Sequence, residues 1–170
     1  VASLYPSLML TFQIFPAKDE LGILPLLLRD LREFRLAAKT LAREAPTEEE
    51  RAYAGGLQQT FKILINSFYG YLGFSMGHWN DFDAANRVTA EGRKLIRQVV
   101  DALKERAATV IEIDTDGIYF VAPPGVADPS GEEALVADLS RGLPPGISLE
   151  LDGRYPAMFS YKMKNYVLLD

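Results

Sequence analysis

The sequence predicts an α+β fold, in which a small antiparallel sheet carries helices on one face and an antiparallel helical hairpin is inserted after the first part of the sheet. Apolar residues recur at helical spacing in long segments before residue 107. Two β-branched or aromatic runs, Thr109–Ile113 and Gly117–Ala122, then flank three turn residues, as in a β-hairpin. Strands and helices do not alternate regularly, which argues against a parallel sheet.

The first 46 residues contain two predicted elements. Val1–Phe15 is apolar with Pro6 inside it, and we predict a short strand that enters a turn and a helical piece. Ile23–Arg43 has apolar residues at helical spacing and is predicted to be a helix. Pro46 ends it, because proline disfavours helical backbone at the preceding residue.

A second long helix is predicted from Thr47 to about Tyr69. Thr47 and Glu50 form a capping box, in which each residue satisfies a free backbone N–H of the other. Gly55–Gly56 lies inside this helix and predicts a bend there, because glycine is a poor helix former. Two long helices joined by about four residues are expected to pack antiparallel.

The last 90 residues are predicted to hold the sheet and two more helices. The helices are expected at about Phe82–Arg106 and Glu132–Arg141, separated by a proline- and glycine-rich loop at Pro123–Gly131. Further strands are expected at Ile147–Leu151 and Tyr166–Leu169.

Composition excludes several classes of protein. The chain has 170 residues, 48% hydrophobic and 24% charged, enough apolar material for a core. It has no cysteine, so disulfides and thiolate metal sites are excluded, and a reducing location is expected: the cytoplasm, or the nucleoid or nucleus. No apolar run approaches the roughly 20 residues that span a bilayer, so no membrane partner is expected. The net charge of −5 disfavours nucleic acid unless a cation site accounts for the acidity.

The first candidate site is Asp114-Thr115-Asp116, between the two runs of the hairpin. Two carboxylates at a turn can hold a hard divalent cation, which prefers oxygen ligands. The simpler alternative is that each aspartate bonds its own backbone in the turn. The same triplet also suits sugar-nucleotide transferases, which use a carboxylate pair on a metal-bound diphosphate.

The second candidate site lies on the second long helix. Lys62, Asn66 and Tyr69 share one helix face, opposite an apolar stripe. A cation one turn from an amide suits a polyphosphate, although a solvated face explains Lys62 alone equally well. The first long helix carries a basic stripe of Arg32, Arg35, Lys39 and Arg43, for which ordinary charge decoration is the alternative.

The order and spacing of these motifs resemble those of family B DNA polymerases. The motifs are Ser3-Leu4-Tyr5-Pro6-Ser7, the basic helix, Lys62 to Gly70, Asp114-Thr115-Asp116 and Lys164-Asn165-Tyr166. The resemblance covers nearly the whole chain and includes the helix around Val88–Arg93. It implies a palm in two parts, residues 1–20 and 75–170, and a fingers hairpin at residues 21–74.

The resemblance implies a DNA-directed DNA polymerase that joins deoxynucleoside triphosphates to a primer 3′-hydroxyl on primer-template DNA. The cofactor would be two Mg²⁺ ions, with Mn²⁺ as a substitute. Asp116 would be the bridging metal ligand, Asp114 an accessory carboxylate, and Val1 a ligand through its backbone carbonyl. Lys62 would donate a proton to the leaving pyrophosphate.

The resemblance also assigns substrate contacts. Nucleotide contacts would come from Ser3 and Leu4 through their backbone N–H groups, from Tyr5 as a steric gate against ribose, and from Arg35, Lys39, Lys62 and Asn66. DNA contacts would come from Tyr69 and Gly70 near the nascent base pair, and from Lys164 and Tyr166 on the primer strand.

Three departures from the family pattern matter. The aspartate that normally begins the first motif would fall just before Val1. Gly117 replaces the usual serine after the aspartate pair, and Glu112 replaces the usual aromatic residue two positions before Asp114. The basic motif around Lys164 has one cation where two are usual. We therefore expect a piece of a longer parent, whose thumb, exonuclease and amino-terminal domains are partners, and expect the piece alone to be inactive.

Three other functions stay open. An RNA-recognition-like binding module would need exposed aromatic residues on its strands, and Tyr119 and Phe120 cannot both face outward. A metal-dependent sugar-nucleotide transferase would rest on Asp114 and Asp116 alone. A degenerate polymerase copy would bind nucleic acid without catalysis.

Overall fold

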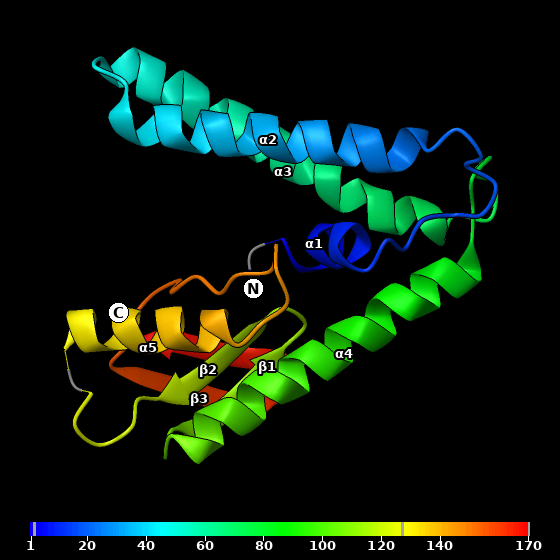
Figure 1. Cartoon of the computed structure of the whole chain (residues 1–170). Coiled ribbons are helices and arrows are strands. Elements are labelled where there is room, and N and C mark those ends of the chain that lie inside the picture. The colour runs from blue at the N-terminus through cyan, green and yellow to red at the C-terminus, as the bar shows by residue number, and fades with distance from the viewer. Residues whose placement is uncertain (2, 127, 170) are drawn as a thin grey trace. The chain divides into compact units, whose positions relative to one another are not determined.

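The computed structural model describes residues 1, 3–126 and 128–169 and confirms the α+β fold class. In chain order the elements are α1 (Leu4–Thr11), α2 (Ile23–Glu44), α3 (Glu48–Leu72), α4 (Phe82–Glu105), β1 (Thr109–Asp114), β2 (Gly117–Val121), α5 (Pro129–Arg141), β3 (Ala157–Lys162) and β4 (Asn165–Leu169) (Figure 1). The chain divides into two compact units, Tyr5–Glu91 and Val1–Leu4 with Gly92–Asp170. The domain boundaries drawn from the resemblance stay predictions.

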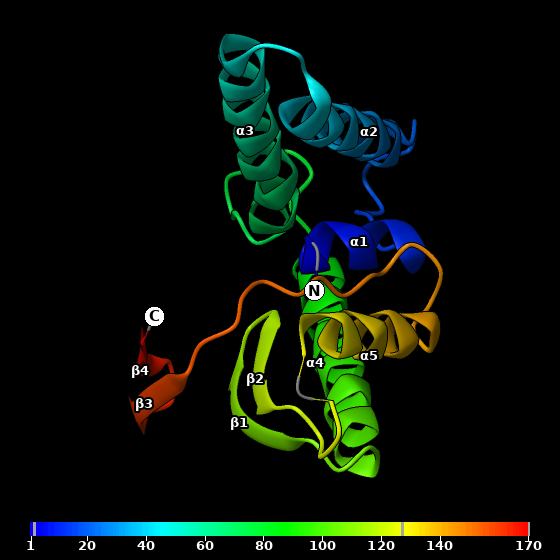
Figure 2. The same cartoon turned by 90° about the vertical axis from the view of Figure 1, so that its left-hand side faces the viewer.

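The unit of Tyr5–Glu91 is built around the helical hairpin of α2 and α3, which run side by side as expected (Figures 1 and 2). Leu28 and Ala38 of α2 and Ala54 and Ile65 of α3 are buried. The Thr47 capping box is present, with the Glu50 backbone N–H donating to the Thr47 side chain and the Glu50 side chain accepting from the Thr47 backbone. α3 continues without interruption through the two glycines.

The start of α2 is fixed by a residue outside the helix. The Asp19 carboxylate accepts hydrogen bonds from the backbone N–H groups of Ile23 and Leu24, at 2.9 and 2.8 Å. Gly22, which precedes the helix, has a φ of 64°, a left-handed value that glycine adopts without strain. These contacts satisfy two N–H groups that every helix start leaves unpaired.

The two chain segments at the base of the helical hairpin are joined by side-chain hydrogen bonds. The Lys18 ammonium donates to the Asn80 side-chain oxygen at 2.8 Å, and the Ala17 N–H donates to Asp81 at 3.3 Å. Asp81 also accepts from the Ala84 N–H at 2.9 Å, in the first turn of α4. The segment that enters the hairpin and the segment that leaves it are thereby held together.

Two strand predictions are wrong. The helical piece expected within Val1–Phe15 is present as α1, but the described residues before it form no strand; α1 begins at Leu4 and accepts Pro6 in its first turn, where a missing N–H costs nothing. Ile147–Leu151 is not a strand: Ile147 is buried, and the Leu149 N–H donates to the Ser140 hydroxyl at 3.0 Å. The strand that pairs with β4 is β3, which the sequence did not reveal.

The core of the other unit lies between its helices and one face of the β1–β2 hairpin. Buried Val99 and Leu103 of α4 meet Leu135 and Leu139 of α5 in a single cluster. The strand residues packed against this cluster are Val110, Ile118 and Phe120. Figure 2 shows α5 and the second half of α4 on the same side of β1 and β2, as the predicted layering requires.

A β-bulge decides which side chains of β1 face this core. Val110 pairs with Phe120, but Glu112 pairs with Tyr119, so Ile111 is an extra residue in the ladder. Directly paired residues of antiparallel strands point to the same face. Val110 and Phe120 therefore face the helices, whereas Glu112 and Tyr119 face the other way.

The two hairpins form separate two-stranded sheets. In the second hairpin Ser160 pairs with Tyr166, so both side chains point to one face of β3–β4. A second bulge follows Ser160, and Lys162 pairs with Asn165 across a turn formed by Met163 and Lys164. This turn brings Lys164 near the tip of the first hairpin.

Candidate active site

Seven polar side chains join the two β-hairpins on the side away from the helices. We call this set the polar face: Glu112, Asp114, Thr115 and Tyr119 of the first hairpin, and Ser160, Lys164 and Tyr166 of the second. All seven belong to one compact unit. The sequence pointed to Asp114, Lys164 and Tyr166, and the structure brings these three together.

Asp114 is the centre of the polar face. The Lys164 ammonium lies 3.1 Å from its Oδ1 atom, and the Thr115 backbone N–H donates to the same oxygen at 2.7 Å. The Thr115 hydrogen bond and then the Lys164 contact lower the pKa of the Asp114 carboxyl below its ordinary value. Asp114 is therefore ionised at neutral pH and presents anionic oxygens at the hairpin tip.

Tyr166 approaches Asp114 from the other side. Its hydroxyl lies 3.0 Å from the Tyr119 hydroxyl and 3.4 Å from Oδ2 of Asp114, and the two rings meet edge to face at 5.0 Å between centroids. The hydrogen bond with Tyr119 is the main reason that the pKa of Tyr166 is raised above its ordinary value. The protonated phenol is therefore a donor toward the carboxylate.

Asp116 lies exposed on the far side of the turn. The Val1 amino nitrogen is 2.5 Å from the Asp116 backbone oxygen, so Val1 lies beside the hairpin tip. Carboxylate and carbonyl oxygens are the donors that Mg²⁺ and Mn²⁺ prefer, so the donor set of Asp114, Asp116 and Val1 fits such an ion. Among the residues described, no group of three or more acidic, histidine or cysteine side chains could hold a metal.

The unit of Tyr5–Glu91 carries most of the other predicted contact residues. The rings of Tyr5 and Tyr69 lie 4.2 Å apart between centroids at 32°, so the residue expected at the sugar and the one expected at the base pair touch. Lys62 and Asn66 are exposed one turn apart on α3. Arg35 and Lys39 of α2 are half-buried.

A ring contact between α2 and α3 shows which basic residues of the two helices lie at the same height along the hairpin. Phe34 of α2 stacks on Phe61 of α3 with centroids 5.9 Å apart. Arg35 and Lys62 are the next residues in their helices, so they lie at a similar height along the hairpin. Each of the two helices thus carries a cation at about this height.

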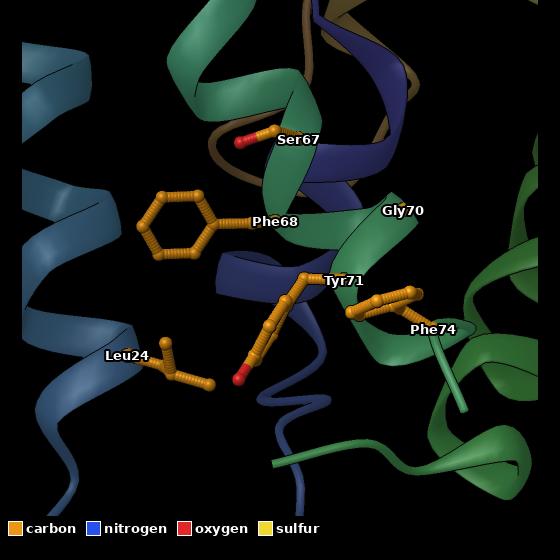
Figure 3. A pocket seen from close by; sticks show the side chains of 6 residues that line it. All are labelled: Leu24, Ser67, Phe68, Gly70, Tyr71 and Phe74. Atoms are coloured by element: carbon orange, nitrogen blue, oxygen red, sulfur yellow. The ribbon is translucent and has the colours of Figure 1, made fainter. Parts of the chain in front are cut away.

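Gly70 lines an apolar cavity of about 490 Å³ between α2 and the end of α3. Figure 3 shows Leu24 on one wall and Phe68, Tyr71 and Phe74 on the other. The Tyr71 hydroxyl accepts from the His78 N–H at 2.9 Å, which fixes one wall. Ser3 and Leu4 lie outside this unit, at the start of the chain.

The sequence did not indicate that Glu112 and Ser160 belong to the polar face. Glu112 was noted only as a departure from the family pattern, and Ser160 was not noted at all. The only local signal was the carboxylate of Glu112 at a position where an aromatic residue is usual.

No helix in the ranges that the structure describes is both long and apolar enough to cross a membrane.

Comparisons with known proteins agree with the motifs. The model of DNA polymerase family B matches residues 11–122. DNA polymerase 1 of Pyrococcus abyssi is 33% identical over 191 aligned residues, which cover 99% of this chain and 25% of that protein. The DNA polymerase of Archaeoglobus fulgidus is 32% identical over 188 aligned residues, covering 97% of this chain and 23% of that protein.

A solved structure shows the same fold. The family B DNA polymerase of Pyrobaculum calidifontis superposes with a TM-score of 0.75 at 26% identity, over 98% of this chain and 24% of that one. The chain thus spans about a quarter of the length of the relatives it matches. With the family model matching most of its residues and the fold shared with a solved member, this chain belongs to the family B DNA polymerases.

Proposed function

We propose that this chain is part of the catalytic core of a DNA polymerase that joins deoxynucleoside triphosphates to a primer 3′-hydroxyl. The observation that carries the proposal is the cluster at the hairpin tip, where ionised Asp114 contacts Lys164 and Tyr166 and lies two residues from Asp116. The activity belongs to the longer protein, with primer-template DNA and its remaining domains as partners.

Asp116, Asp114 and the Val1 carbonyl are the proposed ligands of the divalent ions, two Mg²⁺ ions or Mn²⁺ in their place. When bound, the ions would lower the pKa of the primer hydroxyl and neutralise the triphosphate. Asp114 contributes an anionic oxygen that stays ionised over the working pH range. Tyr166 keeps its proton and orients Asp114 by donating to Oδ2.

The helical hairpin supplies the proposed nucleotide contacts. Lys62 and Asn66 of α3, with Arg35 and Lys39 of α2, would bind the triphosphate, and Lys62 would protonate the pyrophosphate as it leaves. Tyr5 would exclude a 2′-hydroxyl, and its contact with Tyr69 supports this role because a braced ring is a harder steric barrier.

The remaining contacts are proposed for the backbone and the DNA. The N–H groups of Ser3 and Leu4 would meet the phosphate tail. Tyr69 and Gly70 would lie near the nascent base pair, and Lys164 and Tyr166 near the primer strand. Contacts of this kind position nucleic acid and do not read its sequence.

The test is primer extension by a chimera, in which this chain replaces the matching segment of the Pyrococcus abyssi polymerase. With Mg²⁺ and a primed template we expect template-directed incorporation that Asp116→Asn abolishes. The matched control Asp101→Asn, on the exposed surface of α4, should leave the rate unchanged. A folded chimera that binds primed DNA but incorporates nothing with either Mg²⁺ or Mn²⁺ would favour a binding-only descendant.

A further inference from the structure

Glu112 connects the two β-hairpins through both of its carboxylate oxygens. Its Oε2 atom accepts from the Ser160 hydroxyl at 3.0 Å, and its Oε1 atom accepts from the Lys164 backbone N–H at 3.3 Å. Glu112 can reach these groups because the bulge at Ile111 turns it away from the helices. One side chain of β1 therefore holds both β3 and the turn that follows it.

The turn held by Glu112 has an unusual backbone. Lys164 has a φ of 62°, in the left-handed region that turns normally give to glycine or asparagine. A lysine in this conformation persists only where its surroundings impose it. The accepting Glu112 carboxylate is one such constraint, because it fixes the direction of the Lys164 N–H.

The result of this backbone geometry is the position of the Lys164 ammonium. It lies 2.6 Å from the Thr115 hydroxyl and 3.1 Å from Asp114 Oδ1, on the same hairpin tip that carries Asp116. A lysine side chain is long and flexible, so its charge is placed this closely only if its backbone is held.

We propose that Glu112 is a positioning residue that latches the β3–β4 turn to β1 and thereby sets the Lys164 ammonium against Asp114. The proposal rests on the proposed function, because it deepens the role of Lys164 at the primer strand. Glu112 touches no reacting atom and acts through Lys164.

The first test is spectroscopic and uses the whole chain without substrates. In Glu112→Ala the Lys164 amide should exchange with solvent about three- to tenfold faster, the scale of one lost hydrogen bond. The ¹⁵N signal of the Lys164 ammonium should move toward that of a solvated lysine. Glu112→Gln keeps a carbonyl acceptor and should restore part of the protection. The control Glu133→Ala, on exposed α5, should change neither signal.

Folding is checked in the same spectra by the amides of the β1–β2 ladder, whose exchange should be unchanged in every variant. Unchanged exchange at Lys164 in a folded Glu112→Ala chain would overturn the latch. This arm needs no polymerase activity, so it decides on the latch even if the proposed function fails.

The second test measures binding of the chain to a fluorescent primed duplex. Glu112→Ala should weaken binding by the same few-fold factor as Lys164→Ala, and the double variant should be no weaker than Lys164→Ala alone, because the two changes remove one contact. Additive losses would show that Glu112 acts independently of Lys164 and would refute the proposal. Absence of DNA binding by the unaltered chain would count against the proposed function and leave the exchange test to decide on Glu112.

Discussion

Removing the Lys164 ammonium should strengthen the binding of divalent cations at the hairpin tip. In the structure Lys164 lies 3.1 Å from Asp114, so it would compete with a metal ion bound at the proposed site for the same carboxylate. At that distance two unit charges attract by about 1.3 kcal/mol in water, since 332 divided by 80 and by 3.1 is about 1.3. The side chains are 56% and 33% exposed, and exposed pairs contribute only about 0.2–1 kcal/mol in practice.

The expected gain in Mn²⁺ affinity for Lys164→Ala is therefore about 1.4- to fivefold. The assay is a titration of the chain with Mn²⁺, followed by electron paramagnetic resonance of the free ion at low ionic strength. The gain should shrink in 1 M salt, where the Debye length falls to about 3 Å. Asp114→Asn in the Lys164→Ala background should remove it, and Lys104→Ala, at the exposed end of α4, is the control. An unchanged or weaker affinity in Lys164→Ala would refute the competition.

Three further predictions concern stability and charge. Leu103→Ala should lower the free energy of unfolding by about 2–5 kcal/mol in urea titrations, because Leu103 is 1% exposed in the α4–α5 cluster. The control Leu169→Ala, at an exposed site, should lower it by under about 0.5 kcal/mol. Equal losses in the two variants would contradict the assigned core. Asp19→Ala should lower the free energy of unfolding by about 1 kcal/mol, because it removes the acceptor at the start of α2, whereas Asp19→Asn should lower it by less. Equal stability of Asp19→Ala and the unaltered chain would count against the cap. Arg106 and then Arg141 lower the pKa of Asp138, so carboxyl ¹³C titrations should show a rise in that pKa for Arg106→Ala. The stability from this pair is present above the unfolded-state pKa of Asp138 and is lost as pH falls through the folded-state pKa. An unmoved titration midpoint in Arg106→Ala would argue against the ion pair.

The elements that the sequence predicted well are those specified locally. α2, α3, α4 and the β1–β2 hairpin each have helical spacing, a cap or a turn signal within a few residues. The segment Leu4–Thr11 is apolar almost throughout and has no periodicity, so it could not be distinguished from a buried strand. β3 was missed because nearly all of its side chains are exposed, so its residues do not alternate between buried and exposed.

The same distinction holds for the candidate site. Asp114, Asp116, Lys164 and Tyr166 were identified because they belong to short motifs with a known order. Glu112 and Ser160 are 48 residues apart, and no local pattern indicates that they meet. Their contact depends on the registers of two separate hairpins, which only the folded chain defines.

The bulge at Ile111 sets the direction of the acidic side chains of β1. Side chains alternate along a strand, so a β1 of the same length without the bulge would place Glu112 on the same face as Val110. Glu112 and Asp114 would then point toward the packing of α4 and α5, where an unpaired carboxylate is costly to bury. The bulge therefore keeps the acidic side chains on the surface where the proposed chemistry needs them. Deleting Ile111 would leave the pairs Val110–Phe120 and Glu112–Tyr119 in place, so position 111 is a point where β1 can change length without moving those side chains.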